Sequence, residues 1–128
     1  MSDPTQVLSK VLGKGSAHEG AHHWRVQRLT ALALLLLGPW LVISLALLPD
    51  LGYATVQAWA SNLVNATLLV LLTCAACWHS QLGLQVVVED YVGGALRMAT
   101  LIVSAFLHVL LGVLGVLAIV RIALGAPL

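Results

Sequence analysis

A histidine and an Asp–Tyr pair stand at a spacing that suits redox chemistry. His79 lies in residues 51–88, which carry no formal charge, and it precedes Asp90 and Tyr91 by about three helical turns. An ionisable side chain so deep in an apolar segment is costly and usually functional. An imidazole nitrogen can bind haem iron. A tyrosine hydroxyl can donate to a quinone carbonyl oxygen, while a neighbouring carboxylate orients it or relays protons.

The positions around a helix favour the haem interpretation of His79. At 100° per residue, Gly83 lies about 40° from His79, and Val86 and Asp90 each lie about 20° from it. One helix face would therefore carry an imidazole, a gap without a side chain and small apolar surface, which suits a flat macrocycle. The structural alternatives are a neutral histidine bonded to a neighbouring helix, and an acid and a tyrosine that simply mark the membrane interface.

Two further ionisable residues each have two interpretations. Arg28 opens the first apolar stretch at the same membrane face, where it would reach the lipid headgroups or pair with a haem propionate or a partner subunit. His108 lies at a depth similar to that of His79, so one haem held by both is conceivable. A lone histidine among Leu and Val more often bonds across helices.

Two motif matches do not predict a site. Residues 18–22 read His-Glu-Gly-Ala-His and match the H-E-x-x-H zinc signature, but glycine weakens the helix and no third ligand follows. Cys74 and Cys77 precede His79, so the C-x-x-C-H haem motif is missed by one residue. We expect these cysteines to be small packing residues.

The elements that position these residues are membrane spans. The chain has 128 residues, of which 60% are apolar and 9% are charged, with a net charge of +1. A soluble domain needs about a quarter of its residues charged. The composition therefore excludes a soluble enzyme, a nucleic-acid module and a disordered tail. It predicts an all-α integral membrane protein in contact with lipid.

Hydropathy divides the chain into a polar tail, residues 1–28, and a three-helix membrane region, residues 29–128. The spans are expected at about 29–48, 60–88 and 96–124, with a kink at Pro39. With three spans, one membrane side carries five basic residues and the other only Arg121. The positive-inside rule then predicts a cytoplasmic N-terminus and a periplasmic C-terminus. No secretory or mitochondrial targeting pattern is evident, so we expect a bacterial inner-membrane protein.

The order of these residues resembles a known family. Trp24-Arg-Val-Gln-Arg-Leu-Thr-Ala31 enters the first span, and His79-Ser-Gln-Leu-Gly83 leads to Glu89-Asp90-Tyr91. This pattern resembles the hydrophobic membrane-anchor D subunits of bacterial succinate dehydrogenase, respiratory complex II, and the likeness covers nearly the whole apolar part. The histidine-to-Asp-Tyr spacing is its most specific element.

The resemblance implies that His79 is one axial ligand of haem b, with the other supplied by the cytochrome b556 C subunit. It implies that Tyr91, with Asp90 beside it, binds ubiquinone, and that Arg28 lies near the haem propionates or the docked iron–sulfur B subunit. The flavoprotein A subunit would oxidise succinate, which connects the tricarboxylic acid cycle to electron transport. The chain would thus be a subunit of succinate:quinone oxidoreductase and no enzyme alone.

Three rival functions stay open at this point. A fumarate reductase anchor would run the reverse reaction with the same residue types. A self-contained membrane cytochrome b would hold haem between His79 and His108. A non-redox transmembrane scaffold would use His79 only for packing.

Overall fold

The described part of the chain folds into three long helices and one short helix. The computed structural model describes residues 17–125, which form α2 (Ala17–Ala46), α3 (Tyr53–Ser61), α4 (Leu63–Tyr91) and α5 (Gly94–Ala123). Three stretches are long and apolar enough to cross a membrane, namely residues 20–46, 63–91 and 94–123. The expected all-helical fold with three candidate spans is confirmed.

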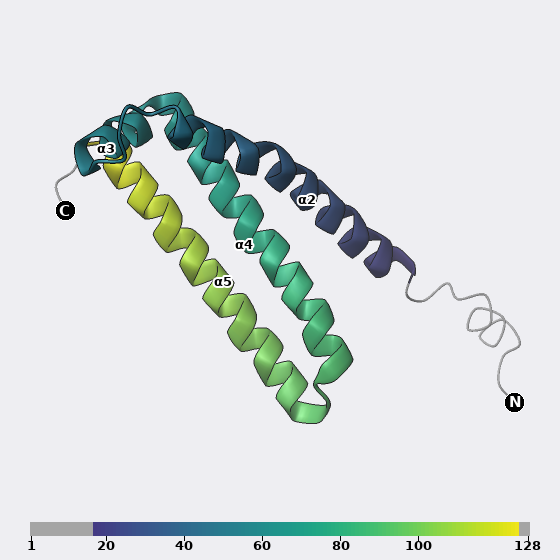
Figure 1. The fold of residues 1–128 in the computed structure, drawn as a ribbon. Coiled ribbons are helices and arrows are strands. Elements are labelled where there is room, and N and C mark those ends of the chain that lie inside the picture. The colour runs from purple at the N-terminus through teal and green to yellow at the C-terminus, as the bar shows by residue number, and fades with distance from the viewer. Residues whose placement is uncertain (1–16, 126–128) are drawn as a thin grey trace, which may run out of the picture.

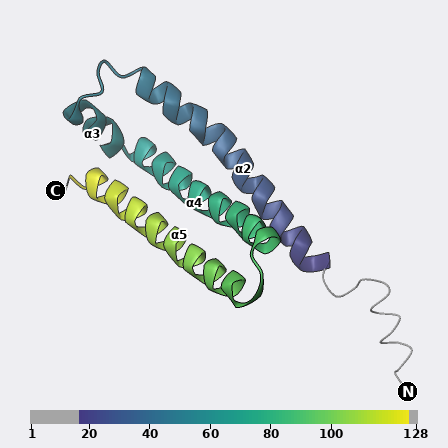
Figure 2. The ribbon, with the colours of Figure 1, turned by 60° about the horizontal axis from the view of Figure 1, so that its bottom comes forward.

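Helix α4 is the centre of the arrangement. It packs against both α2 and α5, which lie on either side of it (Figures 1 and 2). The start of α2 and the turn between α4 and α5 lie at one end of the bundle. Helix α3 and the end of α5 lie at the other, where α3 contacts both α4 and α5. Residues on α4 are therefore placed by two neighbours at once.

The first helix extends well beyond the expected span. Helix α2 begins at Ala17, inside the segment expected to be a polar tail, and continues through Pro39 without interruption. Hydropathy marks where a helix leaves lipid, whereas backbone hydrogen bonding continues into the polar region. The residues around Arg28 consequently stand on a regular helix.

The second span begins later than expected because a short helix precedes it. Asn62 separates α3 from α4, and its side-chain oxygen accepts from the backbone N–H of Val64 and Asn65 at 3.0 and 3.4 Å. An asparagine in this position caps the first turn of the helix that follows. Trp59 lies on α3 and stacks on Trp40 of α2, with ring centroids 5.9 Å apart. This stack fixes α3 against the end of α2.

Helices α4 and α5 form a tight hairpin. Only Val92 and Gly93 join them, and Gly94 adopts a φ of 61°, which glycine reaches without strain. A Cβ atom added at Gly115 would lie 2.8 Å from Cγ2 of Thr73, so the two backbones approach closely there. Small residues permit such contacts between membrane helices.

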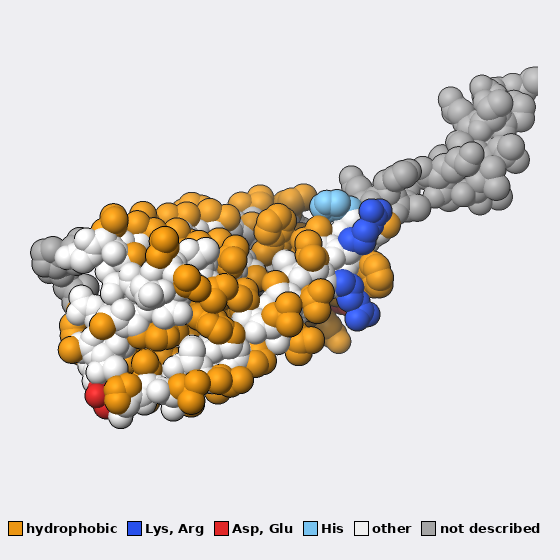
Figure 3. Space-filling view, turned by 90° about the horizontal axis from the view of Figure 1, so that it is seen from above, with side chains coloured by type: hydrophobic (Ala, Val, Ile, Leu, Met, Phe, Trp, Pro, Cys, Tyr) orange, Lys and Arg blue, Asp and Glu red, His pale blue; other side chains and the backbone are white. Residues whose placement is uncertain are grey.

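Little of the chain is buried by its own packing. Within residues 20–125, the buried positions are Thr30, Ala60, Ala66, Val88 and Ser104. Large apolar side chains cover the outside along the length of the helices (Figure 3). In that view basic side chains gather at the end where α2 begins. An apolar flank with charge at its end suits a bundle surrounded by lipid and partner helices.

Candidate functional site

His79 faces α2 with one ring nitrogen engaged and the other free. Its Nδ1 atom lies 3.1 Å from the hydroxyl oxygen of Thr30. Thr30 is only 8% exposed, so this contact is sheltered inside the α2·α4 interface. Within residues 20–125, Nε2 of His79 has no hydrogen-bond partner. One nitrogen held by the protein and one left open is the usual state of a metal-ligating histidine, so His79 fits a haem iron.

The glycine gap beside His79 is present, but part of it faces α2. A Cβ atom added at Gly83 would lie 3.9 Å from Nε2 of the Gln27 side chain, so Gln27 borders the gap. Further along the same face, Val86 is 44% exposed and Asp90 is exposed. The face is therefore covered by α2 near Gly83 and open toward the end of α4.

Asp90 and Tyr91 are the last two residues of α4 and point outward. Tyr91 is 85% exposed, and Asp90 is also exposed. Neither side chain has a hydrogen bond to another residue in the part of the chain that the structure describes. At 1.5 Å per residue, Asp90 lies about 16 Å along the axis from His79. The chain thus presents two separate groups of candidate site residues, which we call half-sites, and neither group is enclosed by the described part of the chain.

Arg28 lies on a different side of α2 from Thr30. Arg28 and Thr30 are two positions apart in the sequence, which places them about 200° apart around the helix axis. Arg28 therefore does not share the α2 surface that contacts His79. Its guanidinium carbon lies 5.5 Å from the ring centroid of Trp24, at cation–π distance. Its side chain is otherwise exposed. This position is open to headgroups, to a propionate or to a docked subunit.

Both ring nitrogens of His108 are engaged within the chain. Nδ1 donates to the carbonyl oxygen of Ser104 at 2.8 Å, and Nε2 accepts from the hydroxyl of Ser80 at 3.1 Å. Ser80 lies about 100° around α4 from His79. The two histidines therefore do not face one space, and the arrangement supports the interpretation of His108 as a link between helices.

Three consecutive residues of α4 bind its two neighbours at the same depth. His79 contacts α2, Ser80 contacts His108 of α5, and Gln81 accepts from the hydroxyl of Ser104 at 2.9 Å. We call residues 79–81 the polar belt. The roles of Ser80, Gln81 and Ser104 were missed in the sequence, because small polar residues in an apolar span do not reveal their partners.

A polar face of α2 was also not predicted from the sequence. His23, Gln27 and Thr30 follow a spacing of four and three residues, which places them on one face of α2. Nε2 of His23 and Oε1 of Gln27 are buried and have no hydrogen-bond partner in the described part of the chain. These three residues form a polar stripe along α2 that ends beside His79. Because buried polar groups usually have partners, the two atoms without one are notable.

With this geometry established, comparison with known proteins identifies the family. The family described as "Succinate dehydrogenase/Fumarate reductase transmembrane subunit" matches residues 2–120. The chain belongs to this family.

Individual relatives agree with this membership. The succinate dehydrogenase hydrophobic membrane anchor subunit of Rickettsia bellii is 32% identical over 105 residues, which cover 81% of this chain and 83% of the relative. The subunit of the same name from Paracoccus denitrificans is 31% identical over 115 residues, covering 89% and 88%. The Rickettsia conorii subunit of that name is 30% identical over 97 residues, covering 75% and 77%. The chain is thus a multi-pass protein of bacterial membranes and an anchor subunit, with the catalytic core elsewhere.

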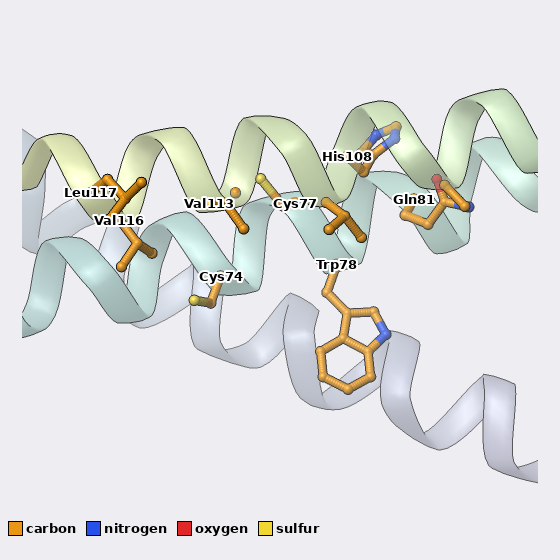
Figure 4. Close-up of a pocket in the computed structure, with 11 residues that line it drawn as sticks. Cys74, Cys77, Trp78, Gln81, His108, Val113, Val116 and Leu117 are labelled. Atoms are coloured by element: carbon orange, nitrogen blue, oxygen red, sulfur yellow. The ribbon is translucent and has the colours of Figure 1, made fainter.

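The anchor also carries an open apolar groove along α4 and α5, with a volume of about 530 Å³ (Figure 4). Cys77, Trp78, His108 and Val113 are among its lining residues, whereas His79, Asp90 and Tyr91 are not. The groove is therefore separate from both half-sites.

The two motif matches are only partly covered by the structure. Both cysteines are free, and Cys77 lies beside Gly112, as expected for a packing residue. The side chains of His18 and Glu19 lie outside the described residues, and His22 is exposed. Within residues 20–125, no three His, Cys, Asp or Glu side chains gather as a metal would require.

Proposed function

We propose that this anchor belongs to succinate:quinone oxidoreductase, where it binds haem b through His79 and forms part of the ubiquinone site with Tyr91 and Asp90. The observation that carries the proposal is the difference between the two ring nitrogens of His79. Its Nδ1 is held by Thr30, while Nε2 has no partner in the described part of the chain. Three relatives named as succinate dehydrogenase subunits favour succinate oxidation over fumarate reduction.

The haem half-site would be completed by the C subunit, which supplies the second axial ligand. The haem, when bound, passes single electrons. His79 would hold its iron, Gly83 would leave room for the macrocycle edge, and the open face near Val86 would contact the companion helices. Arg28 would meet a propionate or the docked iron–sulfur subunit.

The quinone half-site lies at the other end of α4. Electrons from succinate would reach the quinone through the flavin and the iron–sulfur clusters held by the partner subunits. Tyr91 would donate a hydrogen bond to a quinone carbonyl oxygen and stabilise the negative charge that develops there. Asp90 would orient that hydroxyl or deliver a proton. The high exposure of Tyr91 supports this role, because the remaining walls must come from the C and iron–sulfur subunits.

Replacement of Tyr91 by phenylalanine tests the quinone assignment. The change removes one donor and keeps the ring, so the complex should assemble normally. Loss of an oxyanion-type donor costs about 2–4 kcal/mol, which corresponds to a drop of roughly 30- to 1000-fold in quinone reduction. The measurement is succinate:quinone reductase activity of the purified complex.

Two controls make this test specific. Tyr53→Phe removes the other tyrosine hydroxyl, at the opposite end of the bundle on α3, and should leave the activity unchanged. Succinate oxidation with an artificial acceptor that takes electrons upstream of the quinone should stay near normal in Tyr91→Phe. Full quinone reductase activity in Tyr91→Phe would instead place Tyr91 among the interfacial aromatic residues.

A further inference from the structure

We infer that Thr30 is a positioning residue for the haem ligand: its hydroxyl fixes the tautomer and ring orientation of His79 and thereby sets the reduction potential of the haem. This inference rests on the proposed function, since it concerns the iron that His79 would hold. It follows from the hydrogen bonding of a single hydroxyl group.

The hydroxyl of Thr30 has three neighbours but only one hydrogen to donate. It lies 2.9 Å from the carbonyl oxygen of Val26 and 3.1 Å from that of Gln27. Both carbonyl oxygens can only accept, so the hydroxyl hydrogen must point toward them. The third neighbour, Nδ1 of His79 at 3.1 Å, then has to be the donor.

The tautomer of His79 follows from this assignment. A neutral imidazole that carries its hydrogen on Nδ1 has its lone pair on Nε2. The helix backbone of α2 therefore dictates, through Thr30, which nitrogen of His79 is available to a metal. Burial of Thr30 strengthens the effect, because water does not compete well for a hydroxyl that is 8% exposed.

His108 is an internal comparison for this assignment. It has the same tautomer, since its Nδ1 donates to a carbonyl oxygen, but its Nε2 is taken by Ser80. In both histidines Nδ1 donates to an oxygen, that of a hydroxyl for His79 and that of a carbonyl for His108, so the difference in availability lies at Nε2. Thr30 thus provides for His79 what the backbone carbonyl of Ser104 provides for His108, and of these two histidines His79 alone keeps a nitrogen without a partner in the described part of the chain.

The hydrogen bond should also tune the iron. When the second nitrogen of a ligating histidine donates to an acceptor, the ligand becomes more basic and the ring is held in place. A more basic ligand stabilises the oxidised iron. Removal of the Thr30 acceptor should therefore make the midpoint potential of the haem more positive.

The experiment compares three variants in the purified complex. Thr30→Val keeps the branched shape and removes the hydroxyl, whereas Thr30→Ser keeps the hydroxyl. Thr100→Val is the matched control, because the Thr100 hydroxyl donates only to the carbonyl oxygen of Leu96, with no histidine beside it. The readouts are the haem midpoint potential in a redox titration and the electron paramagnetic resonance spectrum of the oxidised haem, which reports ligand orientation.

We expect a positive shift of the potential and an altered spectrum in Thr30→Val, and values close to wild type in Thr30→Ser and Thr100→Val. If Thr30→Val assembles with its partner subunits but loses haem, recovery of haem in Thr30→Ser supports the inference, and failure to recover it overturns the inference. An unchanged potential in haem-containing Thr30→Val also overturns it. Absence of haem from the wild-type complex would instead contradict the proposed function.

Discussion

Two histidines on adjacent helices have the same imidazole ring, but only one of them keeps a ring nitrogen without a partner in the described part of the chain. His79 keeps Nε2 without a partner in the described part of the chain, whereas His108 binds Ser104 of its own helix through Nδ1 and Ser80 of α4 through Nε2. At the residue scale, the proposed haem ligation therefore depends on Nε2, which Ser80 occupies in His108 and which has no partner in His79 within the described part of the chain.

Alanine substitution of the two histidines tests this difference. We expect His79→Ala to weaken or abolish haem binding, because it removes the only free imidazole nitrogen in the polar belt. His108→Ala should leave the haem absorption spectrum largely intact and lower the stability of the complex, because Ser80 loses its partner. The measurement is the haem-to-protein ratio and the reduced-minus-oxidised spectrum of the purified complex. Loss of haem in His108→Ala together with its retention in His79→Ala would reverse the ligand assignment.

The sequence predicts which residues form the candidate site, but it does not reveal their hydrogen-bond partners. The depth of His79 and its distance from Asp90 can be predicted from the sequence, because both residues lie on one helix. The contact of His79 with Thr30 depends on the rotation of α2 against α4, and a span that is apolar on every face does not define that rotation. For the same reason the pairing of Gln81 with Ser104 could not be predicted.

At the scale of elements, the α4·α5 hairpin is held by close backbone contact. Two glycines of α5 face α4, with Gly115 against Thr73 and Gly112 against Cys77. The hydroxyl of Thr73 donates to the carbonyl oxygen of Leu69 at 2.8 Å, which fixes the orientation of its methyl group. Thr73 therefore has little freedom to move away from an added atom.

Alanine at the two glycines should give different results. In Gly115→Ala the new Cβ would lie 2.8 Å from Cγ2 of Thr73, which forces the helices apart. We expect a destabilisation of about 1–3 kcal/mol, as for other overpacked interiors. Gly112→Ala is the control, because its Cβ would meet Cys77 at 3.7 Å, an ordinary contact. The measurement is thermal unfolding of the detergent-solubilised complex, and equal midpoints for both variants would contradict the close approach.

Element boundaries were predictable only where the chain changes from polar to apolar. The start of α5 and the end of α4 lie within a few residues of their expected positions. The break at Asn62 was missed because it falls in a long uncharged stretch, although Asn is a common helix cap. The polar start of α2 was missed because hydropathy follows the bilayer, and the helix continues beyond it.

At the scale of the whole molecule, the described part of the chain leaves most of its apolar surface uncovered. Few side chains are buried by its own packing, while α4 presents its open face and Tyr91 to the outside. Lipid and the other subunits must cover the remainder. Both proposed cofactor sites then lie at the boundary between subunits.

The direction of the chain across the membrane can be tested directly. The basic residues gather at the end where α2 begins and α4 turns into α5, which predicts that this end and the N-terminus are cytoplasmic. A fluorescent protein fused to the N-terminus should therefore be bright, and alkaline phosphatase fused to the C-terminus should be active. The reverse pattern would contradict the orientation and place Tyr91 at the periplasmic face.

The polar belt has a consequence for how the chain enters the membrane. A helix inserted alone must leave its polar side chains unpaired in hydrocarbon, at a cost for each group. For α4 these are the side chains of residues 79–81, and α5 supplies the partners of two of them. The two-residue link allows the nascent hairpin to leave the insertion machinery as one unit, with α5 shielding α4 on one flank. Helix α2 precedes both helices in the chain, so the partner of His79 is made before α4, whereas the partners of Ser80 and Gln81 are made after it.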